Sequence, residues 1–169
     1  MKRSTDTKLL EKARVRLVKL AKKHGLNLRQ NYNLVTKKSL RKINGYLHAR
    51  QMKRAKSEIK RFKTLVGRIS RDCQRKIEDN ELFQQAFAEI LAQTNHLLTR
   101  KPSDKNKLYS LHEPAVSCIS KGKSHKKYEF GSKVSLSMTH KKGVSIVTSA
   151  LSFSNNPYDG HTFVVRQQY

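Results

Sequence analysis

The apolar positions of the chain recur with two different periods, one over residues 1–100 and another after residue 107. In the first part they return every three or four residues, which is the spacing of one face of a helix. The clearest run falls within about 80° of a helical wheel turning roughly 100° per residue. It comprises Ala55, Ile59, Phe62, Val66, Ile69 and Cys73. We expect a helix here with a narrow apolar seam.

This pattern predicts helices over about 7–24, 36–77 and 81–99. Asp6 is the expected N-cap of the first helix, and Gly25 is the residue expected to end it. Thr36 is the expected cap of the second, and Gly45 or Gly67 is the expected place of a kink, because glycine weakens a helix interior. Folded back on one another, the helices form a hairpin or small bundle that buries the seam.

After residue 107 the apolar positions alternate, which is typical of strands with one buried face. Strands are predicted over 128–138 and 144–151, with weaker candidates at 108–111 and 116–119, a turn at 140–143, a turn cluster at 155–160 and a helix beginning at His161. The predicted class is therefore α+β, a basic helical bundle over 1–100 and a small antiparallel sheet over 108–169. A polar linker over 101–107 separates them.

Positive charge dominates the composition. The 37 Lys and Arg residues face 12 Asp and Glu residues, for a net charge of +25 over 169 residues. Residues 1–76 alone carry a net +21. So many positive charges repel one another unless a polyanion neutralises them, and nucleic acid is the abundant intracellular polyanion. No apolar stretch approaches the ~18 residues of a membrane span, so a membrane protein is not expected.

A broad basic face is predicted opposite the seam of the second helix. It contains Lys53, Lys56, Lys60, Arg61, Lys63, Arg68, Arg71 and Arg75. These residues are the predicted nucleic-acid contacts, since cations neutralise phosphates and release counterions. The alternative is a solvated charged face that binds nothing. No helix-turn-helix or zinc-finger pattern points to sequence-specific recognition.

Catalytic patterns are missing from the sequence. The basic segment 121–127 lacks the spacing of a phosphate-binding loop, and we expect a plain basic loop there. Asp159 and His161 have two interpretations. Together they are half of an acid–base pair, or Asp159 is a turn or cap residue and His161 lies in the first turn of a helix. Cys73 and Cys118 are expected as buried apolar residues rather than nucleophiles or metal ligands.

Eight segments of the chain nevertheless match fixed motifs, and they occur in the same order as in one protein family. They are residues 5–10, 23–25, 28–30, 45–51, 108–114, 118–123, 128–135 and 156–162, the last including Tyr158, Asp159, Gly160 and His161. Through these motifs the chain resembles bacterial insertion-sequence transposases of the DDE type over nearly its whole length.

The resemblance implies an RNase-H-like core in which three carboxylates hold two Mg²⁺ ions for DNA strand transfer. By that alignment this chain begins after the first catalytic aspartate and ends before the second, and Asp159 is a motif residue outside the triad. We therefore expect a truncated transposase with a partial RNase-H-like sheet and no catalytic or metal-binding residues. It would need no cofactor and would bind DNA without transferring strands.

Two other interpretations remain open. One is a stand-alone basic protein associated with the ribosome or the nucleoid. The other is a partner of the full-length transposase that inhibits it. The expected location of the chain is the cytoplasm, in association with the nucleoid.

Overall fold

A computed structural model of the chain describes residues 2–101, 103–104, 107–120, 128–139, 143–153, 157–158 and 160–161. These residues form four helices and four strands, so the predicted α+β class is confirmed. They belong to two compact units, Met1–Leu111 and His112–Tyr169.

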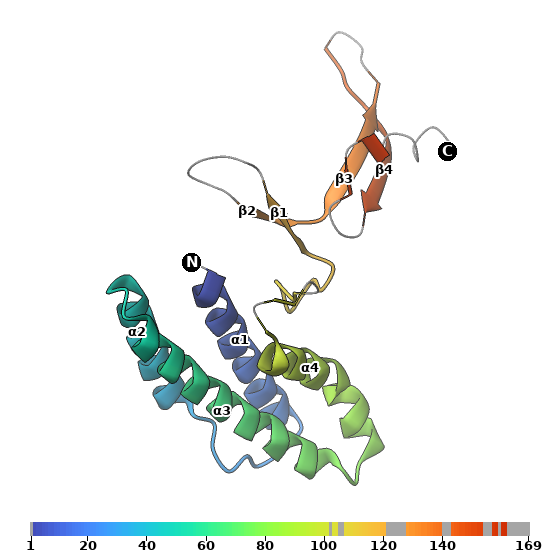
Figure 1. Ribbon diagram of the computed structural model, residues 1–169. Coiled ribbons are helices and arrows are strands. Elements are labelled where there is room, and N and C mark those ends of the chain that lie inside the picture. Colours follow the sequence, from blue (N-terminus) through green and yellow to red (C-terminus); the bar gives the residue numbers. More distant parts are fainter. Residues whose placement is uncertain are drawn as a thin grey trace. The chain divides into compact units, whose positions relative to one another are not determined.

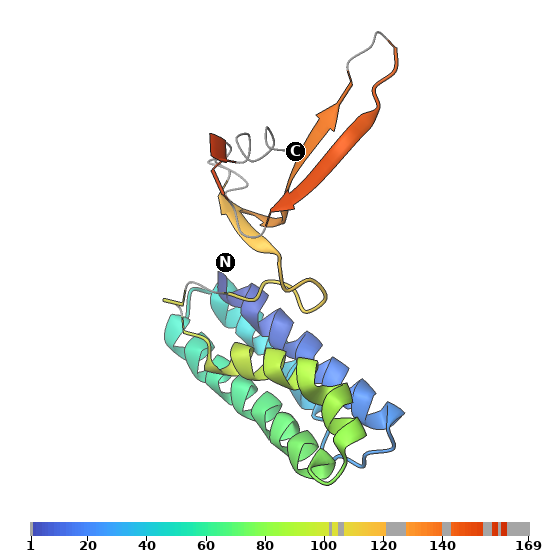
Figure 2. The same cartoon turned by 90° about the vertical axis from the view of Figure 1, so that its right-hand side faces the viewer.

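The first unit is a bundle of four helices, α1 (Lys2–Lys23), α2 (Asn33–His48), α3 (Met52–Ile77) and α4 (Glu81–Thr99). Helix α3 contacts each of the other three, and α1 also packs on α4 (Figures 1 and 2). The predicted third helix is confirmed as α4, which begins where the Asn80 side chain accepts a hydrogen bond from the Phe83 N–H at 3.1 Å. Side-chain capping of this kind satisfies an otherwise unpaired helix donor.

Helix α1 ends as predicted but begins earlier. Gly25 has a φ of +68°, and the Leu26 N–H donates to the Ala21 carbonyl at 2.8 Å, which is the hydrogen bond of a Schellman ending. Asp6, the expected cap, instead lies inside the helix and pairs with Arg100 at 3.3 Å. The prediction of a cap failed because this carboxylate has a partner on the segment after α4.

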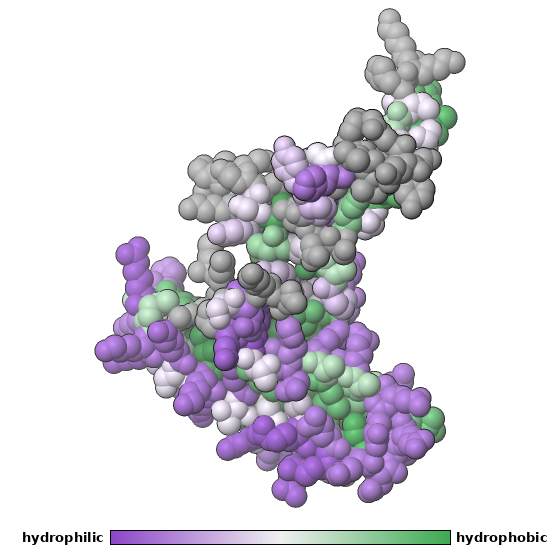
Figure 3. Space-filling model, turned by 45° about the vertical axis from the view of Figure 1, so that its right-hand side comes forward, coloured by the Kyte–Doolittle hydropathy of each residue, from purple (hydrophilic) through white to green (hydrophobic). Residues whose placement is uncertain are grey.

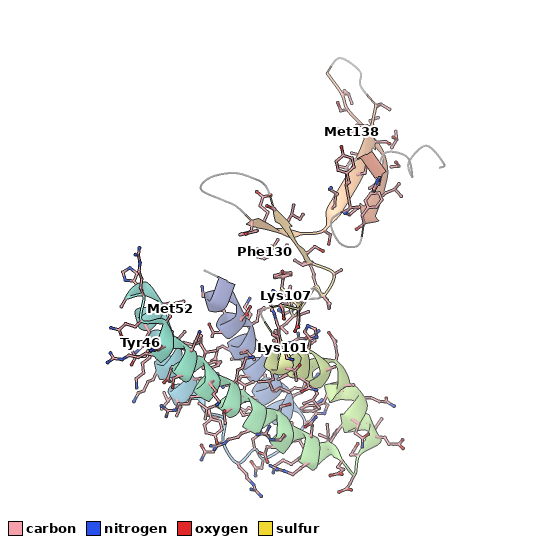
Figure 4. All side chains as sticks on the ribbon, viewed as in Figure 1. Tyr46, Met52, Lys101, Lys107, Phe130 and Met138 are labelled. Carbon is pink, nitrogen blue, oxygen red and sulfur yellow. The ribbon has the colours of Figure 1, made fainter. Side chains whose placement is uncertain are left out.

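The predicted single helix over 36–77 is wrong, because the chain breaks into α2 and α3 at residues 49–51. Arg50 adopts a left-handed conformation, with φ at 55°, and the Gln51 N–H donates to the Tyr46 carbonyl at 2.8 Å. Gly45 and Gly67, the expected kinks, both lie inside unbroken helices. Figure 4 labels Tyr46 and Met52 on the two sides of the break.

Helix α2 also begins without the expected threonine cap. It starts at Asn33, and the preceding Tyr32 is left-handed with φ at 50°. Thr36 is buried within the helix, and its hydroxyl donates to the Tyr32 carbonyl at 2.9 Å. Thr36 is therefore the fourth residue of the helix rather than the residue before it, and its hydroxyl bonds back to the preceding turn as an interior threonine does.

The predicted seam of α3 lies in the core of the bundle. Phe62 and Val66 belong to one buried cluster with Leu10 of α1, Ile43 of α2 and Leu97 of α4. A second cluster, towards the other end of α3, groups Leu17, Ile69, Cys73, Phe87 and Ile90 among its buried members. The seam therefore joins all four helices.

The segment after α4 belongs to the helical unit. Leu111 is buried in the first cluster, Leu108 packs against it, and Arg16 of α1 donates to the Leu111 carbonyl at 2.8 Å. Residues 108–111 are not a strand, contrary to the prediction. Their apolar side chains serve the helical core instead of a sheet.

The described residues of the second unit form two separate antiparallel pairs rather than one sheet. Strand β1 (Ser117–Ser120) pairs with β2 (Tyr128–Gly131), and β3 (Lys133–Met138) pairs with β4 (Val147–Phe153). The predicted strand 128–138 is therefore two strands that meet at Ser132 and take different partners. Gly160 and His161 are helical. The basic loop 121–127, the turn residues 140–142, residues 155, 156 and 159 of the turn cluster, and the predicted helix beyond His161 lie outside the described residues.

The apolar side of these strands is exposed, although a buried face was predicted. Phe130, Val134, Leu136 and Met138 are each at least half exposed (Figure 4 labels the first and last). In β3 they alternate with half-buried lysine and serine positions. Alternation identifies a strand and its two faces, but a second layer is needed to bury one of them.

A pH prediction follows from the buried thiol in the second core cluster. Burial raises the pKa of Cys73 to about 11, the Asp72 carboxylate adds to the rise, and Lys76 opposes it. An unfolded thiol ionises near pH 9. The free energy of unfolding should therefore be undiminished below about pH 9 and fall as the pH rises from about 9 to about 11. Urea denaturation across this range would measure it.

The Cys73→Ala variant is the control for this prediction. It should start less stable at neutral pH because it leaves a small cavity, yet lose less stability over the alkaline range. Equal losses in the two proteins would contradict a role for the thiol.

Candidate nucleic-acid interface

The predicted basic residues of α3 form an exposed face on the side away from the core. Seven of the eight are exposed: Lys53, Lys56, Lys60, Arg61, Arg68, Arg71 and Arg75. They occupy this face because the apolar residues between them fix the rotation of the helix in the bundle. Hydrophilic side chains cover most of the helical unit in the view of Figure 3. We call these seven residues the basic face.

Lys63, the eighth predicted contact, lies elsewhere. It is half-buried, and its ammonium donates to the Leu98 carbonyl at 3.0 Å and to the Arg100 carbonyl at 3.5 Å. These carbonyls lie at the C-terminal end of α4, where a cation interacts favourably with the helix dipole. Lys63 thus joins α3 to α4.

Few carboxylates neutralise the basic face. Among the residues that the structure describes, ion pairs within 4.0 Å form at Arg61 with Glu58, at 4.0 Å, and at Arg75 with Asp72, at 3.4 Å. Both arginine side chains remain about 60% exposed. At these lengths and with the guanidinium groups in solvent, the pairs contribute little energy, so the guanidinium groups stay available to an anion.

The C-terminal half of the basic face lines a cavity of about 330 Å³ that sequence analysis did not predict. We call it the arginine pocket. Its polar lining comprises Arg68, Arg71, Asp72 and Arg75 from α3 and Arg29, Gln30 and Tyr32 from the segment between α1 and α2. The three α3 arginines are spaced by three and four residues, so they share one helix face.

Hydrogen bonds hold the 24–32 segment against α3. The Arg29 backbone N–H donates to Asp72 Oδ2 at 2.9 Å, and Asp72 is only 6% exposed. From the other side, buried Arg14 donates to the Asn31 carbonyl at 2.8 Å while pairing with Glu11 at 2.6 Å. Asp72 therefore positions the Arg29 side of the pocket and adds one negative charge to the lining.

Two local features shape the pocket further. Tyr32 holds a left-handed backbone, which costs a residue with a side chain roughly 1–2 kcal/mol. Gly67 leaves room beside Arg71, because a Cβ at this position would lie 3.3 Å from Arg71 Nη1. A small shift of the exposed Arg71 guanidinium would relieve this contact.

Two motif residues of the second unit, Tyr158 and His161, lie close together. The Tyr158 and His161 rings meet edge to face with centroids 5.7 Å apart, and both residues are exposed. Asp159 lies outside the described residues. Within the described part of the chain, no group of three or more His, Cys, Asp or Glu residues could hold a metal ion. Cys118 is half-buried in β1.

Comparison with known proteins adds no relative: no protein family, curated protein or solved structure matches the chain. None of the described helices is both long and apolar enough to cross a membrane.

Proposed function

We propose that the chain binds DNA through the basic face of α3. We further propose, from the sequence motifs, that it is a member of the insertion-sequence DDE transposases that retains DNA binding without strand transfer, and that it acts in the cytoplasm on the nucleoid. The observation that carries the binding proposal is the basic face itself. It presents seven exposed cations along one 26-residue helix.

Helix geometry supports contact with a duplex. A 26-residue helix is about 39 Å long, comparable to one turn of B-DNA at about 34–36 Å. Lysine and arginine repeated along such a helix can follow the phosphates of a groove. The absence of a base-reading motif in the sequence favours contact with the DNA backbone over recognition of a base sequence.

The proposed lack of strand transfer rests on the shortage of carboxylates. Two-metal phosphoryl transfer needs several carboxylates converging on ions about 3.5–4 Å apart. Acids of the second unit such as Glu113 and Glu129 belong to no metal-binding group among the described residues. A stand-alone basic binding protein is the second candidate, and the bundle's own two-cluster core favours it.

The experiment is a fluorescence titration of a 20-base-pair duplex at several salt concentrations. With five to seven phosphate contacts, the logarithm of affinity should fall against the logarithm of salt with a slope of about −4 to −6. That slope corresponds to a loss of about 10³-fold between 50 and 200 mM salt. Chelation of divalent ions should leave binding unchanged, and added Mg²⁺ should produce no nicking of plasmid DNA.

Three results discriminate the possibilities. A salt slope near zero would contradict phosphate binding. Nicking that requires Mg²⁺ and survives repurification would contradict the loss of strand-transfer chemistry. Preferential capture of ribosomal RNA over duplex DNA at equal salt would favour the second candidate.

A further inference from the structure

The arginine pocket differs from the rest of the basic face because it is concave and is built from two parts of the chain. Arg29 reaches it from the segment between α1 and α2, and Arg68, Arg71 and Arg75 reach it from α3. Four arginine residues therefore line one cavity. The mutual repulsion of their charges favours binding of an anion in or near the pocket.

The carboxylate already present does not balance these charges. Asp72 is the acidic residue in the lining, and its two oxygens accept from the Arg29 backbone N–H and from the Arg75 guanidinium. With four arginines and one aspartate, the lining of the pocket keeps a net charge of about +3. Guanidinium groups bind phosphate oxygens in bidentate fashion, which makes phosphate the anion that this arrangement fits best.

The remaining lining is suited to more than a phosphate. Tyr32 supplies an aromatic surface, and Gln30 supplies an amide that can donate and accept. A volume of about 330 Å³ exceeds what one phosphate fills and lies at the lower end of small-molecule sites. Bases stack on aromatic side chains in proteins that bind single strands. In a duplex the bases are stacked between the two strands, so they cannot enter the arginine pocket.

We propose that the arginine pocket binds one unpaired nucleotide of a nucleic-acid strand. The arginines hold its phosphate, and its base lies against Tyr32. This inference rests on the proposed function, nucleic-acid binding, and adds to it a discrete site for single-stranded substrate. The left-handed Tyr32 fits such a role, since strained backbone collects at binding sites.

The test compares two variants that lose three charges each. The pocket variant is R29Q/R68Q/R71Q, which spares the Arg75–Asp72 pair. The control is K53Q/K56Q/K60Q on the same basic face, at least eight residues or about 12 Å along the helix from Arg68. That distance exceeds the Debye length of ~8 Å at 0.15 M salt. The probes are a fluorescent pentathymidylate and a 20-base-pair duplex.

For pentathymidylate, the pocket variant should bind about 30–100-fold more weakly than the wild-type chain, and the control less than 5-fold more weakly. A helix signal and a urea midpoint equal to those of the wild-type chain would establish that each variant is folded. Equal losses in the two variants would overturn the pocket as a site. Wild-type protein that binds neither probe would overturn the proposed function as well.

A second pair of variants tests the base. Tyr32→Leu should weaken pentathymidylate binding about 10-fold, and Tyr32→Phe should leave it unchanged. An abasic pentamer carries the same phosphates without bases. It should bind the wild-type chain about 10-fold more weakly than pentathymidylate and bind Tyr32→Leu as it binds the wild type. Equal binding of the two pentamers to the wild-type chain would overturn the nucleotide and leave an anion site.

Discussion

Neutralising four exposed cations in the first half of α3 should lower the affinity of the chain for a 20-base-pair duplex by about 10²–10³-fold at 150 mM salt. The variant is K53Q/K56Q/K60Q/R61Q. Each phosphate contact releases nearly one counterion, which is worth about fivefold in affinity at this salt concentration. The salt slope should become shallower by about 3 to 4. Fluorescence anisotropy at four salt concentrations measures both quantities.

The control for this prediction removes four charges from another helix. Lys8, Lys12, Lys19 and Lys22 are exposed on α1, and replacing them with glutamine changes the net charge by the same amount. If the basic face is the interface, this variant should lose less than about 10-fold. Equal losses in the two variants would mean that net charge alone attracts DNA, without a defined face.

The helices were largely predictable because their pattern is local. The seam from Ala55 to Cys73 repeats often enough to specify one face of α3, and Gly25 ends α1 for a reason visible in the sequence. The break at Arg50 was not predictable from residue preference. Arginine seldom adopts the left-handed conformation, and the hydrogen bonds around it join only backbone groups of residues 45–52, so no residue type marks the break.

The strands were predicted in kind but not in pairing. Alternation fixes which residues of β3 share a face, yet the partner strand and its register come from tertiary structure. In the structure, Val134 lies opposite Ser152 and Leu136 opposite Ala150, so the apolar column of β3 meets small residues of β4. The likeness to an RNase-H-like core stays a prediction.

One part of the candidate site was predictable from the sequence, and another part was not. Composition and the helical wheel identified the basic face, since exposure follows from the position of the seam. The arginine pocket depends on Arg29 and Tyr32, which lie about 40 residues before their neighbours on α3. The signal available in the sequence was a polar segment holding an arginine and a tyrosine. Only the bonds made by Asp72 and Arg14 show where that segment lies.

The largest loss of stability is expected from Phe62→Ala. Phe62 is fully buried, and its cluster draws buried residues from α1, α2 and α4 as well as α3. Truncating such a ring removes its transfer free energy and leaves a cavity that four helices cannot all relax to fill, at a cost of about 3–5 kcal/mol. That is a large share of the ~5–15 kcal/mol that stabilises a typical domain. Urea denaturation of the full chain, followed by the helix signal, would measure the change.

Leu82→Ala is the matched control, because Leu82 lies on α4 in the same unit with 74% of its surface exposed. Its replacement should change the free energy of unfolding by less than about 0.5 kcal/mol.

The basic face depends on Phe62 as well, since the buried seam is what turns the cations of α3 outward. Under conditions that half-unfold Phe62→Ala, duplex affinity should therefore fall in parallel with the helix signal. A variant that loses less than about 1 kcal/mol would show that α3 keeps its rotation by other contacts.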